Sequence, residues 1–437
     1  MGIQRRLKSL VPHVLKSFIC QLYTSIKEII LIWRVKKQQK ESLAKLKDKR
    51  QIRCVFFALF EEIWKVDDVY RLMANNSRFD PIILVCPIVN YGHDNMVERM
   101  NICYDSFKNK GYRVFKAYNE SDNSYVDVIK DINPDIIVYT NPYKGLIDGR
   151  YYITKFSQIL TIYTPYYFGE WNKYKIMYDL LFHNLLWRYY IETPILGDLS
   201  KKYSRNKGRN TVVVGYPGIE KLITQNYALS PNIWKEGLST KKRIIWAPHH
   251  TIEKTEVCNY SCFLKYSDFM IKMANKYKDK VQLAFKPHPL LRNKLNLLWG
   301  KDRTDAYYYC WDQMPNACLK GGDYVDLFRT SDAMIHDSGS FIAEYLYVNK
   351  PVMRTMTKTP LSEEFNPFAL SCLEQYYLAN SEEDIEQFIL NVINNVDPLK
   401  EKRTKFVNEV LMPNGSPSQN IVNDIVDSID RQILYRN

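Results

Sequence analysis

Three short segments in the second half of the sequence carry side chains suited to binding and activating an anionic substrate. They are WAPHH (246–250), KPHP (286–289) and HDSGS (336–340), and they hold four of the seven histidines. Each follows a short apolar run, and an open parallel sheet places its ligand-binding loops at the carboxyl ends of such strands. Because Gly or Pro forces a turn in each segment, the three predict one polar pocket built for an anion.

The HDSGS segment is the predicted anion site. Its loop consists of Asp337, Ser338, Gly339 and Ser340. A helix predicted to begin near Phe341 would offer free backbone N–H groups and its positive dipole end, which suit a nucleotide diphosphate. Glu344, about one turn into that helix, can accept both hydroxyls of a ribose. In the alternative interpretation, Asp337 and Ser338 only cap the helix and Glu344 is a solvated surface residue.

The KPHP and WAPHH segments supply candidates for acid–base chemistry. Two prolines fix the chain on both sides of His288, so its imidazole is suited to donating a hydrogen bond, or a proton, to a phosphate or leaving group. We take His288 and His250 as candidate catalytic residues, and Lys286 and His249 as candidates for binding the phosphates. Alternatively, each histidine is satisfied by a neighbouring carbonyl. A metal site is also open, but no carboxylate lies at a spacing that would complete it, so we expect no metal or cofactor.

The elements that must position these loops alternate between strand and helix. In the first half, the strand-like runs are 52–58, 81–89, 112–117, 135–140 and 158–164, with helical stretches at 67–75 and 95–110. Such alternation predicts a doubly wound parallel sheet. A less regular section follows from 168 to 210, and then a strand, a turn and a helix start at 211–222.

The second half repeats this α/β pattern around the three motifs. Helices are predicted at 263–278, 323–330 and 341–348, and later ones at 382–395, 400–411 and 419–435, the last being a candidate to cross back to the first half. We therefore predict two Rossmann-like doubly wound domains that face a cleft. The predicted ranges are a basic segment at 1–50, a first domain at 51–225 and a nucleotide-binding domain at 226–437.

The basic charge is concentrated at the N-terminus. Residues 1–50 hold 13 Lys and Arg against 3 Asp and Glu, which leaves 48 against 45 for the rest of the chain. The body is therefore nearly neutral, which argues against a nucleic-acid-binding protein and for a basic attachment segment.

Within that segment, apolar residues recur at three- and four-residue spacing from Leu7, Leu10 and Val11 to Trp33, with basic residues around them. This spacing predicts an amphipathic helix. Lys16, Lys27 and Glu28 interrupt every window of about 20 residues, so we expect a helix in the headgroup region of an anionic membrane rather than a spanning one. A helix packed on the protein's own surface and a coiled-coil dimer arm are the alternatives.

The nine cysteines indicate a reducing compartment. They form no CxxC pair and have no histidine at zinc-finger spacing, and no small-residue cleavage site follows the first apolar stretch. We expect reduced thiols in a cytosolic protein that associates with the cytoplasmic face of the membrane.

The order of these motifs resembles the C-terminal half of the CDP-glycerol glycerophosphotransferases, the polymerases and primases of teichoic acid synthesis. The resemblance covers 243–355 and includes the phrase NKPV at 349–352. It implies a GT-B architecture, CDP-glycerol as donor, and attachment to the membrane through a basic surface. It also implies that His288 contacts the donor phosphates and assists the leaving group, that Ser338 and Ser340 hold the diphosphate, and that Asp337 orders the loop.

Two departures from that family concern the site. The family loop usually has a tyrosine between the aspartate and the serines, whereas this chain reads DSGS. The family also carries an N-terminal histidine, thought to be the general base, in a segment reading tryptophan, histidine, glycine, threonine, proline. The nearest counterpart, TIYTPYYFGE (161–170), has no histidine. The candidate bases are Glu170, Glu61, Glu62 and His93, and a carboxylate in this role needs a pKa raised by burial.

We therefore expect in-line transfer of a polyol phosphate, chiefly glycerol phosphate, from a CDP-activated donor to a glycan or lipid-linked acceptor. A nucleotide-sugar glycosyltransferase of capsule or lipopolysaccharide assembly, a UDP-sugar epimerase, and a non-catalytic membrane-bound scaffold remain alternatives. The aromatic-rich stretch 163–190, with Tyr166 and Trp171, is expected to line the acceptor side, because aromatic faces suit sugar rings.

Overall fold

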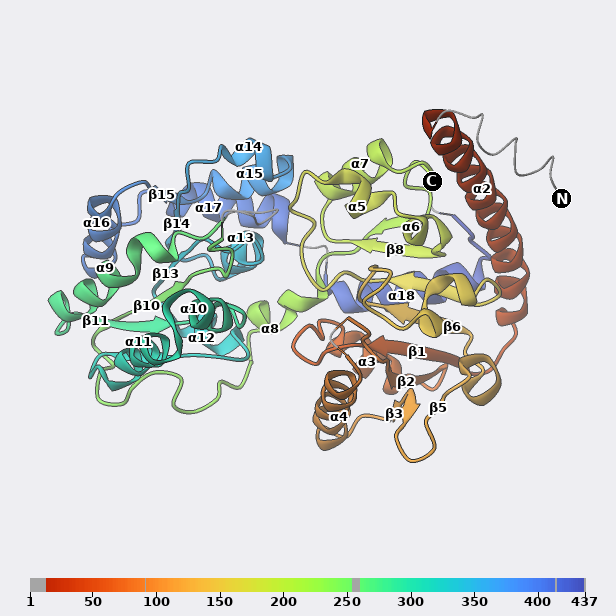
Figure 1. Ribbon diagram of the computed structural model, residues 1–437, viewed down its shortest axis with the longest axis horizontal. Coiled ribbons are helices and arrows are strands. Elements are labelled where there is room, and N and C mark those ends of the chain that lie inside the picture. The colour runs from red at the N-terminus through yellow and green to blue at the C-terminus, as the bar shows by residue number, and fades with distance from the viewer. Residues whose placement is uncertain (1–12, 91, 254–259, 413–414, 436–437) are drawn as a thin grey trace.

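The computed structural model describes residues 13–90, 92–253, 260–412 and 415–435, with side chains from Leu22 onward. Figure 1 shows two α/β lobes joined near the short helix α8, each built on one parallel sheet. We call the lobe that holds the N-terminal strands the first lobe and the other the second lobe. The long helix α2 lies against the outer side of the first lobe.

The first lobe contains a seven-stranded sheet in the order β3-β2-β1-β6-β7-β8-β9. Every neighbouring pair in it is parallel. Its strands are β1 Ile52–Ala58, β2 Phe79–Val85, β3 Val114–Lys116, β6 Ile136–Tyr139, β7 Leu160–Tyr163, β8 Arg188–Ile191 and β9 Thr211–Val213. The central strands are buried on both faces, as continuous apolar runs in a parallel sheet require.

The second lobe contains a six-stranded parallel sheet in the order β12-β11-β10-β13-β14-β15. Its strands are β10 Lys242–Ala247, β11 Val281–Phe285, β12 Ala317–Leu319, β13 Ala333–His336, β14 Val352–Thr355 and β15 Tyr377–Ala379. The strands β11, β10 and β13 are neighbours, so the three loops that follow them start at one edge of the sheet.

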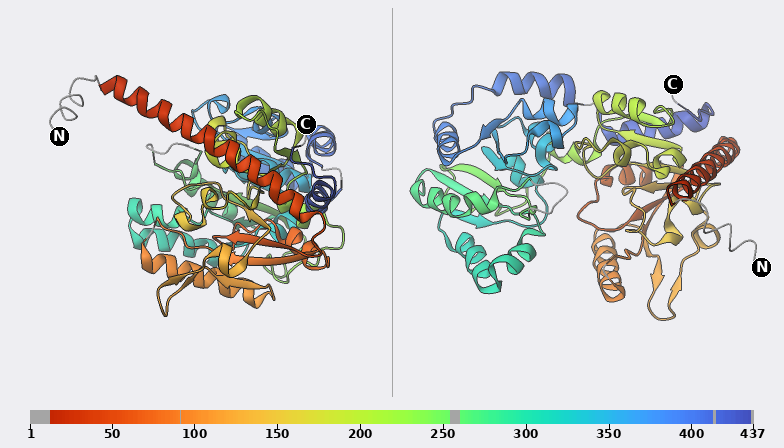
Figure 2. Two further views of the ribbon diagram at one scale, coloured as in Figure 1. Left: turned by 90° about the vertical axis from the view of Figure 1, so that its right-hand side faces the viewer. Right: turned by 45° about the horizontal axis from the view of Figure 1, so that its top comes forward.

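Helices cover both faces of each sheet (Figures 1 and 2). Those of the first lobe are α2 His13–Leu46, α3 Asp67–Ala74, α4 His93–Asn109, α5 Tyr174–Tyr178, α6 Leu181–Leu185 and α7 Pro194–Tyr203. Helix α8 Glu220–Ile223 lies between the lobes. The second lobe has α9 Phe263–Lys276, α10 Leu291–Trp299, α11 Lys301–Gln313, α12 Val325–Thr330, α13 Phe341–Glu344, α14 Leu361–Glu364, α15 Pro367–Leu373, α16 Glu382–Ile393 and α17 Lys400–Phe406. A two-stranded ribbon, β4 Tyr118–Asn119 with β5 Ser124–Tyr125, projects from the first lobe.

The last helix, α18 Pro417–Asp430, returns to the first lobe, as the sequence suggested for its final helical segment. Asp424 on α18 accepts a hydrogen bond from Arg188 Nε of β8 at 2.9 Å, and both side chains are buried. Tyr190 Oη donates to the same carboxylate at 2.9 Å. The two chain segments that cross between the lobes are also tied together, because Glu220 accepts hydrogen bonds from the backbone N–H of Ser418 at 2.9 Å and from its hydroxyl at 2.6 Å.

Helix α2 is divided into a packed half and an exposed half. Toward its C-terminal end, Val35 and Leu43 are buried, and Gln39 Nε2 donates to Leu185 O at 2.8 Å. Toward its N-terminal end, the exposed apolar or aromatic side chains are Leu22, Tyr23, Ile26, Ile29, Ile30 and Trp33. The predicted apolar positions Leu7, Leu10 and Val11 lie outside the described residues. Within the described residues, no helix has the length and apolar character needed to cross a membrane.

Candidate active site

Backbone hydrogen bonds hold the WAPHH and KPHP loops against each other. Strand β10 pairs with β11 so that Trp246 is opposite Phe285, and with β13 so that Ala247 is opposite His336. Beyond the strands, the N–H of His288 donates to Pro248 O at 3.0 Å. The predicted convergence of these two loops at one edge of the second sheet is therefore present in the structure.

The histidines of the two loops form a compact cluster, which we call the histidine cluster: His249, His250 and His288. Ring centroids lie 4.3 Å apart for His249 and His250, 4.3 Å for His250 and His288, and 4.9 Å for His249 and His288. Burial, with smaller contributions from neighbouring imidazoles and cations, lowers the pKa of His249 to about 2, of His288 to about 3 and of His250 to about 4. The three imidazoles are consequently neutral near pH 7.

Hydrogen bonds indicate which nitrogens of these rings donate and which accept. The backbone N–H of Leu290 donates to Nδ1 of His288 at 3.2 Å, which assigns the ring proton to Nε2 and makes that atom a donor. Nδ1 of His249 is 3.0 Å from the hydroxyl of Thr251. Nδ1 of His250 is buried and finds no hydrogen-bonding group within the described structure.

The ligand atoms of the histidine cluster lie within 4.8 Å of one another, so the cluster has the composition of a metal site. However, coordination by Nε2 of His288 would require the proton to move to Nδ1, where the Leu290 N–H already points. The hydrogen bonding therefore favours N–H donation to an anion over coordination of a cation.

Asp337 ties the HDSGS loop to the WAPHH loop. Its Oδ1 accepts from the N–H of His249 at 2.5 Å and its Oδ2 from the N–H of Cys262 at 2.7 Å. Burial raises the pKa of this carboxyl to about 6. Helix α13 has no side-chain cap, so the alternative in which Asp337 and Ser338 serve only as caps is wrong.

A buried cation outside the three sequence motifs lies against this loop. Arg354, at the end of β14, donates from Nη1 to Ser338 O at 3.1 Å and is buried. Its guanidinium also lies 5.0 Å from the ring centroid of Phe365. The sequence does contain a signal for Arg354, because it is a charged residue inside the apolar run KPVMRTM. A cation in a buried strand needs a functional or structural counter-group.

Lys286 is buried and directed at the neighbouring loop. Its Nζ donates to Gly322 O at 2.8 Å, and burial lowers its pKa to about 8. It remains close enough to His288 to lower the pKa of that imidazole.

Glu344 is buried rather than solvated, so its alternative interpretation as a surface residue is wrong. Its carboxylate accepts a hydrogen bond from Tyr324 Oη. Lys65, from the first lobe, donates to the same Tyr324 hydroxyl at 3.2 Å. The predicted ribose-binding carboxylate is thus linked across the lobes through a tyrosine.

Glu170 approaches the HDSGS loop from the first lobe. Its Oε2 lies 3.8 Å from the position that a Cβ on Gly339 would occupy, and its Oε1 is buried with no hydrogen-bonding group among the described residues. Its backbone O accepts from Asn366 N at 2.9 Å, which fixes the approach. Burial, followed by the charge of Glu344, raises the pKa of Glu170 well above its ordinary value, while a hydrogen bond from the Ala343 backbone opposes the shift.

The other three candidate bases lie on the surface of the first lobe. Glu61 forms an ion pair with Lys110, and Glu62 and His93 are exposed. None of the three contacts the histidine cluster or the HDSGS loop in the described structure.

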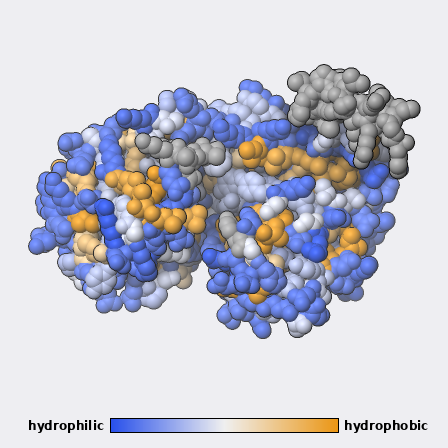
Figure 3. Space-filling model, viewed as in Figure 1, coloured by the Kyte–Doolittle hydropathy of each residue, from blue (hydrophilic) through white to orange (hydrophobic). Residues whose placement is uncertain are grey.

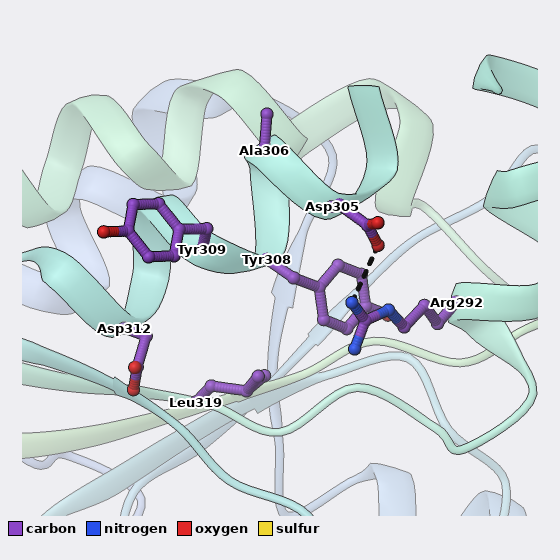
Figure 4. Close-up of a pocket in the computed structure, with 7 residues that line it drawn as sticks. All are labelled: Arg292, Asp305, Ala306, Tyr308, Tyr309, Asp312 and Leu319. Atoms are coloured by element: carbon purple, nitrogen blue, oxygen red, sulfur yellow. Dashed lines mark hydrogen bonds and ion pairs between the residues drawn. The ribbon is translucent and has the colours of Figure 1, made fainter. Parts of the chain in front are cut away.

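A surface depression of about 610 Å³ lies between α10 and α11 (Figure 4). Arg292 of α10 points at Asp305 of α11 there, and no predicted site residue is in its lining.

A family model described as CDP-glycerol:poly(glycerophosphate) glycerophosphotransferase matches residues 194–427. No curated protein matches the sequence. A solved variant of the wall teichoic acid polymerase TagF is 14% identical with a TM-score of 0.56, covering 95% of this chain and 99% of that chain. A putative UDP-N-acetylglucosamine 2-epimerase from Listeria monocytogenes is 14% identical with a TM-score of 0.55, covering 87% and 97%.

A further solved structure, S. aureus MnaA with UDP, is 15% identical with a TM-score of 0.53, covering 86% of this chain and 96% of that chain. At these identities the likeness shows the fold. It confirms the predicted architecture, which is of the GT-B type: two Rossmann-like doubly wound domains preceded by an N-terminal helix.

Proposed function

The chain belongs to the CDP-glycerol:poly(glycerophosphate) glycerophosphotransferase family, and on that premise we propose that it transfers glycerol phosphate, or a related polyol phosphate, from a CDP-activated donor to a glycan or lipid-linked acceptor. The observation that carries the proposal is the junction of the histidine cluster with the Asp337–Ser340 loop at one sheet edge. Neutral imidazole N–H groups, loop hydroxyls and buried cations together suit a diphosphate.

In this reaction an acceptor hydroxyl oxygen attacks the phosphorus that carries the glycerol. The bond from that phosphorus to the bridging oxygen breaks, and CMP leaves with the electron pair. The acceptor's proton passes to a base. Such a step needs positioning and charge stabilisation more than covalent chemistry from the protein.

On the donor side, His288 is the residue proposed to assist the leaving group. Its Nε2–H donates to the phosphate oxygen on which negative charge develops. Its pKa is lowered to about 3 by burial, so the ring is proposed to act as a neutral hydrogen-bond donor through Nε2–H. Lys286, His249 and His250 add donors around the same phosphates, and Ser338 and Ser340 supply hydroxyls.

On the acceptor side, Glu170 is the proposed base. It is the one candidate among the four considered whose carboxyl reaches the HDSGS loop, and it does so from the lobe opposite the histidine cluster. A carboxylate with a pKa raised by burial is a stronger base once it is ionised. Tyr166 and Trp171 flank Glu170 in the sequence and are proposed to contact the acceptor.

Helix α2 is the proposed attachment to the cytoplasmic face of an anionic membrane. Its exposed apolar side chains, from Leu22 to Trp33, belong to a segment with a local excess of ten basic residues. Both features favour a helix in the headgroup region. The proposed domain ranges are 1–50, 51–225 and 226–437, with α18 returning to the first lobe.

The deciding experiment is calorimetric titration of the full chain with CDP-glycerol, CDP, UDP and UDP-N-acetylglucosamine. We expect selective binding of the cytidine compounds, lost in His288→Ala and in Ser338→Ala and retained in the matched surface control His93→Ala. Preference for uridine compounds would instead support a sugar transferase or an epimerase. Absence of all nucleotide binding would leave the non-catalytic scaffold.

A further inference from the structure

Helix α10 buries one apolar side and exposes another. Leu291 and Leu295 are fully buried in the core of the second lobe. In contrast, Leu290, Leu297 and Leu298 expose 48%, 85% and 56% of their surface. Leu290 and Leu297 are about two helical turns apart and therefore lie on one side of the helix. Single exposed leucines are ordinary, but three gathered on one short helix form a patch.

The charge around this patch is basic. Between residues 286 and 303 the chain holds five Lys and Arg and one acidic residue, Asp302. Of the five, Lys286 is buried, and Arg292 and Lys301 form ion pairs with Asp305, which leaves Lys294 and Arg303 beside the patch. Lys294 lies one turn after Leu290, on the same side as the patch, and the Arg303 guanidinium lies 4.5 Å from the centroid of the Trp299 ring. Exposed leucines bordered by basic residues and a tryptophan are typical of a helix that lies in the headgroup region of an anionic membrane.

The patch and helix α2 are presented on the same side of the molecule. Figure 3 shows hydrophobic surface on the second lobe where α10 lies in Figure 1, facing the viewer. In the left view of Figure 2, the N-terminal half of α2 and the helices α10 and α11, drawn in teal, extend toward the side that faces the viewer in Figure 1. One planar surface can therefore contact both helices.

We propose that α10, in the second lobe, is a second membrane contact. Leu290, Leu297 and Leu298 insert at the acyl boundary, and Lys294 and Arg303 bind the lipid phosphates. Because the Leu290 N–H donates to Nδ1 of His288, this contact places the histidine cluster next to the lipid surface. That last consequence rests on the proposed function, whereas the contact itself does not.

The test is flotation of the full-length protein with phosphatidylglycerol–phosphatidylcholine vesicles and with pure phosphatidylcholine vesicles. The double variant Leu297→Ser/Leu298→Ser should bind the anionic vesicles about tenfold more weakly, because two partly inserted leucines are lost. The matched control Ile102→Ser removes an exposed aliphatic side chain from α4 and should bind as the wild type does. Added salt should weaken wild-type binding, since the attraction is partly electrostatic.

Equal anionic-vesicle binding by the wild type and the double variant would overturn the proposal. So would a concentration-dependent wild-type dimer that the double variant cannot form, because the patch would then be an interface between copies. The variant Ile29→Ser/Ile30→Ser changes only α2, so it measures the contribution of α2 to vesicle binding separately from that of α10. If donor titrations show no nucleotide binding while the α10 variant still loses vesicle binding, the proposed function fails and this inference stands.

Discussion

The carboxyl edges of the two sheets present different chemistry. In the second lobe, the loops after β10 and β11 carry three imidazoles and a lysine, and burial lowers the pKa of all four groups. In the first lobe, β6 and β7 end in tyrosines, and the buried carboxyls Glu170 and Glu192 have raised pKa values. The loops after β10 and β11 therefore hold neutral bases and cations suited to phosphates, with the raised-pKa carboxyl of Asp337 beside them, whereas the first-lobe edge holds raised-pKa carboxyls among aromatic rings and no such histidine cluster among the described residues.

This difference suggests a division of labour. The second lobe would bind and polarise the charged donor, while the first would receive a neutral, ring-shaped or chain-like acceptor and remove its proton. Burial drives both sets of pKa shifts, so each edge is tuned by desolvation rather than by ion pairing.

The largest effect is expected at the donor edge. His288→Ala should lower turnover by about a thousandfold with CDP-glycerol, because the leaving group loses its N–H donor. The loss of turnover is measured as the rate of CMP release, with His93→Ala as the surface control. Full activity in His288→Ala would remove the histidine cluster from the mechanism.

At the acceptor edge, Glu170→Gln should lower turnover by about a hundredfold while donor affinity stays unchanged. Donor titration measures the donor affinity and steady-state kinetics measure the turnover, both on the same preparation. In the wild type, kcat should rise with pH as Glu170 ionises, and that rise should be absent in Glu170→Gln. A variant that loses donor binding instead would place Glu170 with the donor site.

The two edges should also respond oppositely to pH in their contributions to stability. The pKa of Glu192 is raised to about 8 by burial, so its contribution falls as pH rises from its ordinary pKa near 4.5 toward 8. The histidines have lowered pKa values, so their contribution is lost as pH falls below about 6.5. Denaturant unfolding of Glu192→Gln should therefore show a stability gain over the wild type that grows to a few kcal/mol between pH 5 and 8. A gain that does not change with pH would contradict this account.

A smaller effect is expected from the aromatic residues near Glu170. Tyr166→Ala and Trp171→Ala should each raise the acceptor KM by about tenfold and leave donor affinity unchanged, since an aromatic face contributes about one to two kcal/mol to a stacked ring. Unchanged acceptor KM in both variants would place the acceptor elsewhere.

The smallest effect is expected from chelation. If the histidine cluster donates N–H bonds to phosphate, EDTA should not change turnover or the unfolding midpoint. Loss of activity restored by Zn²⁺ would show instead that the three rings coordinate a metal.

The fold could be predicted from the sequence wherever burial leaves a continuous apolar run, as in β1, β2 and β11. Strand β8 is not predicted, because Arg188 interrupts the run and its compensating Asp424 is 236 residues away. Helices α10 and α11 are not predicted either, although Leu291 and Leu295 carry the helical spacing and Gly300, with φ of 84°, separates the two helices.

In the site, the motif residues could be identified because chain geometry forces three adjacent loops together. The contacts that cross between lobes could not, since they join residues far apart in sequence. The hydrogen bond from Lys65 of the first lobe to Tyr324 of the second is an example. The resemblance to the family segment at 161–170 points to Glu170, whereas no local pattern does. Neither the resemblance nor a motif points to Arg354.

The hydrogen bonds between Glu220 and Ser418 have a consequence for motion. The chain passes between the lobes twice, and this carboxylate fastens the two passages to each other. Because the two crossings are joined to each other, a displacement of one lobe relative to the other has to involve both passages of the chain together. Glu220→Ala removes these hydrogen bonds, so each passage could then move without the other.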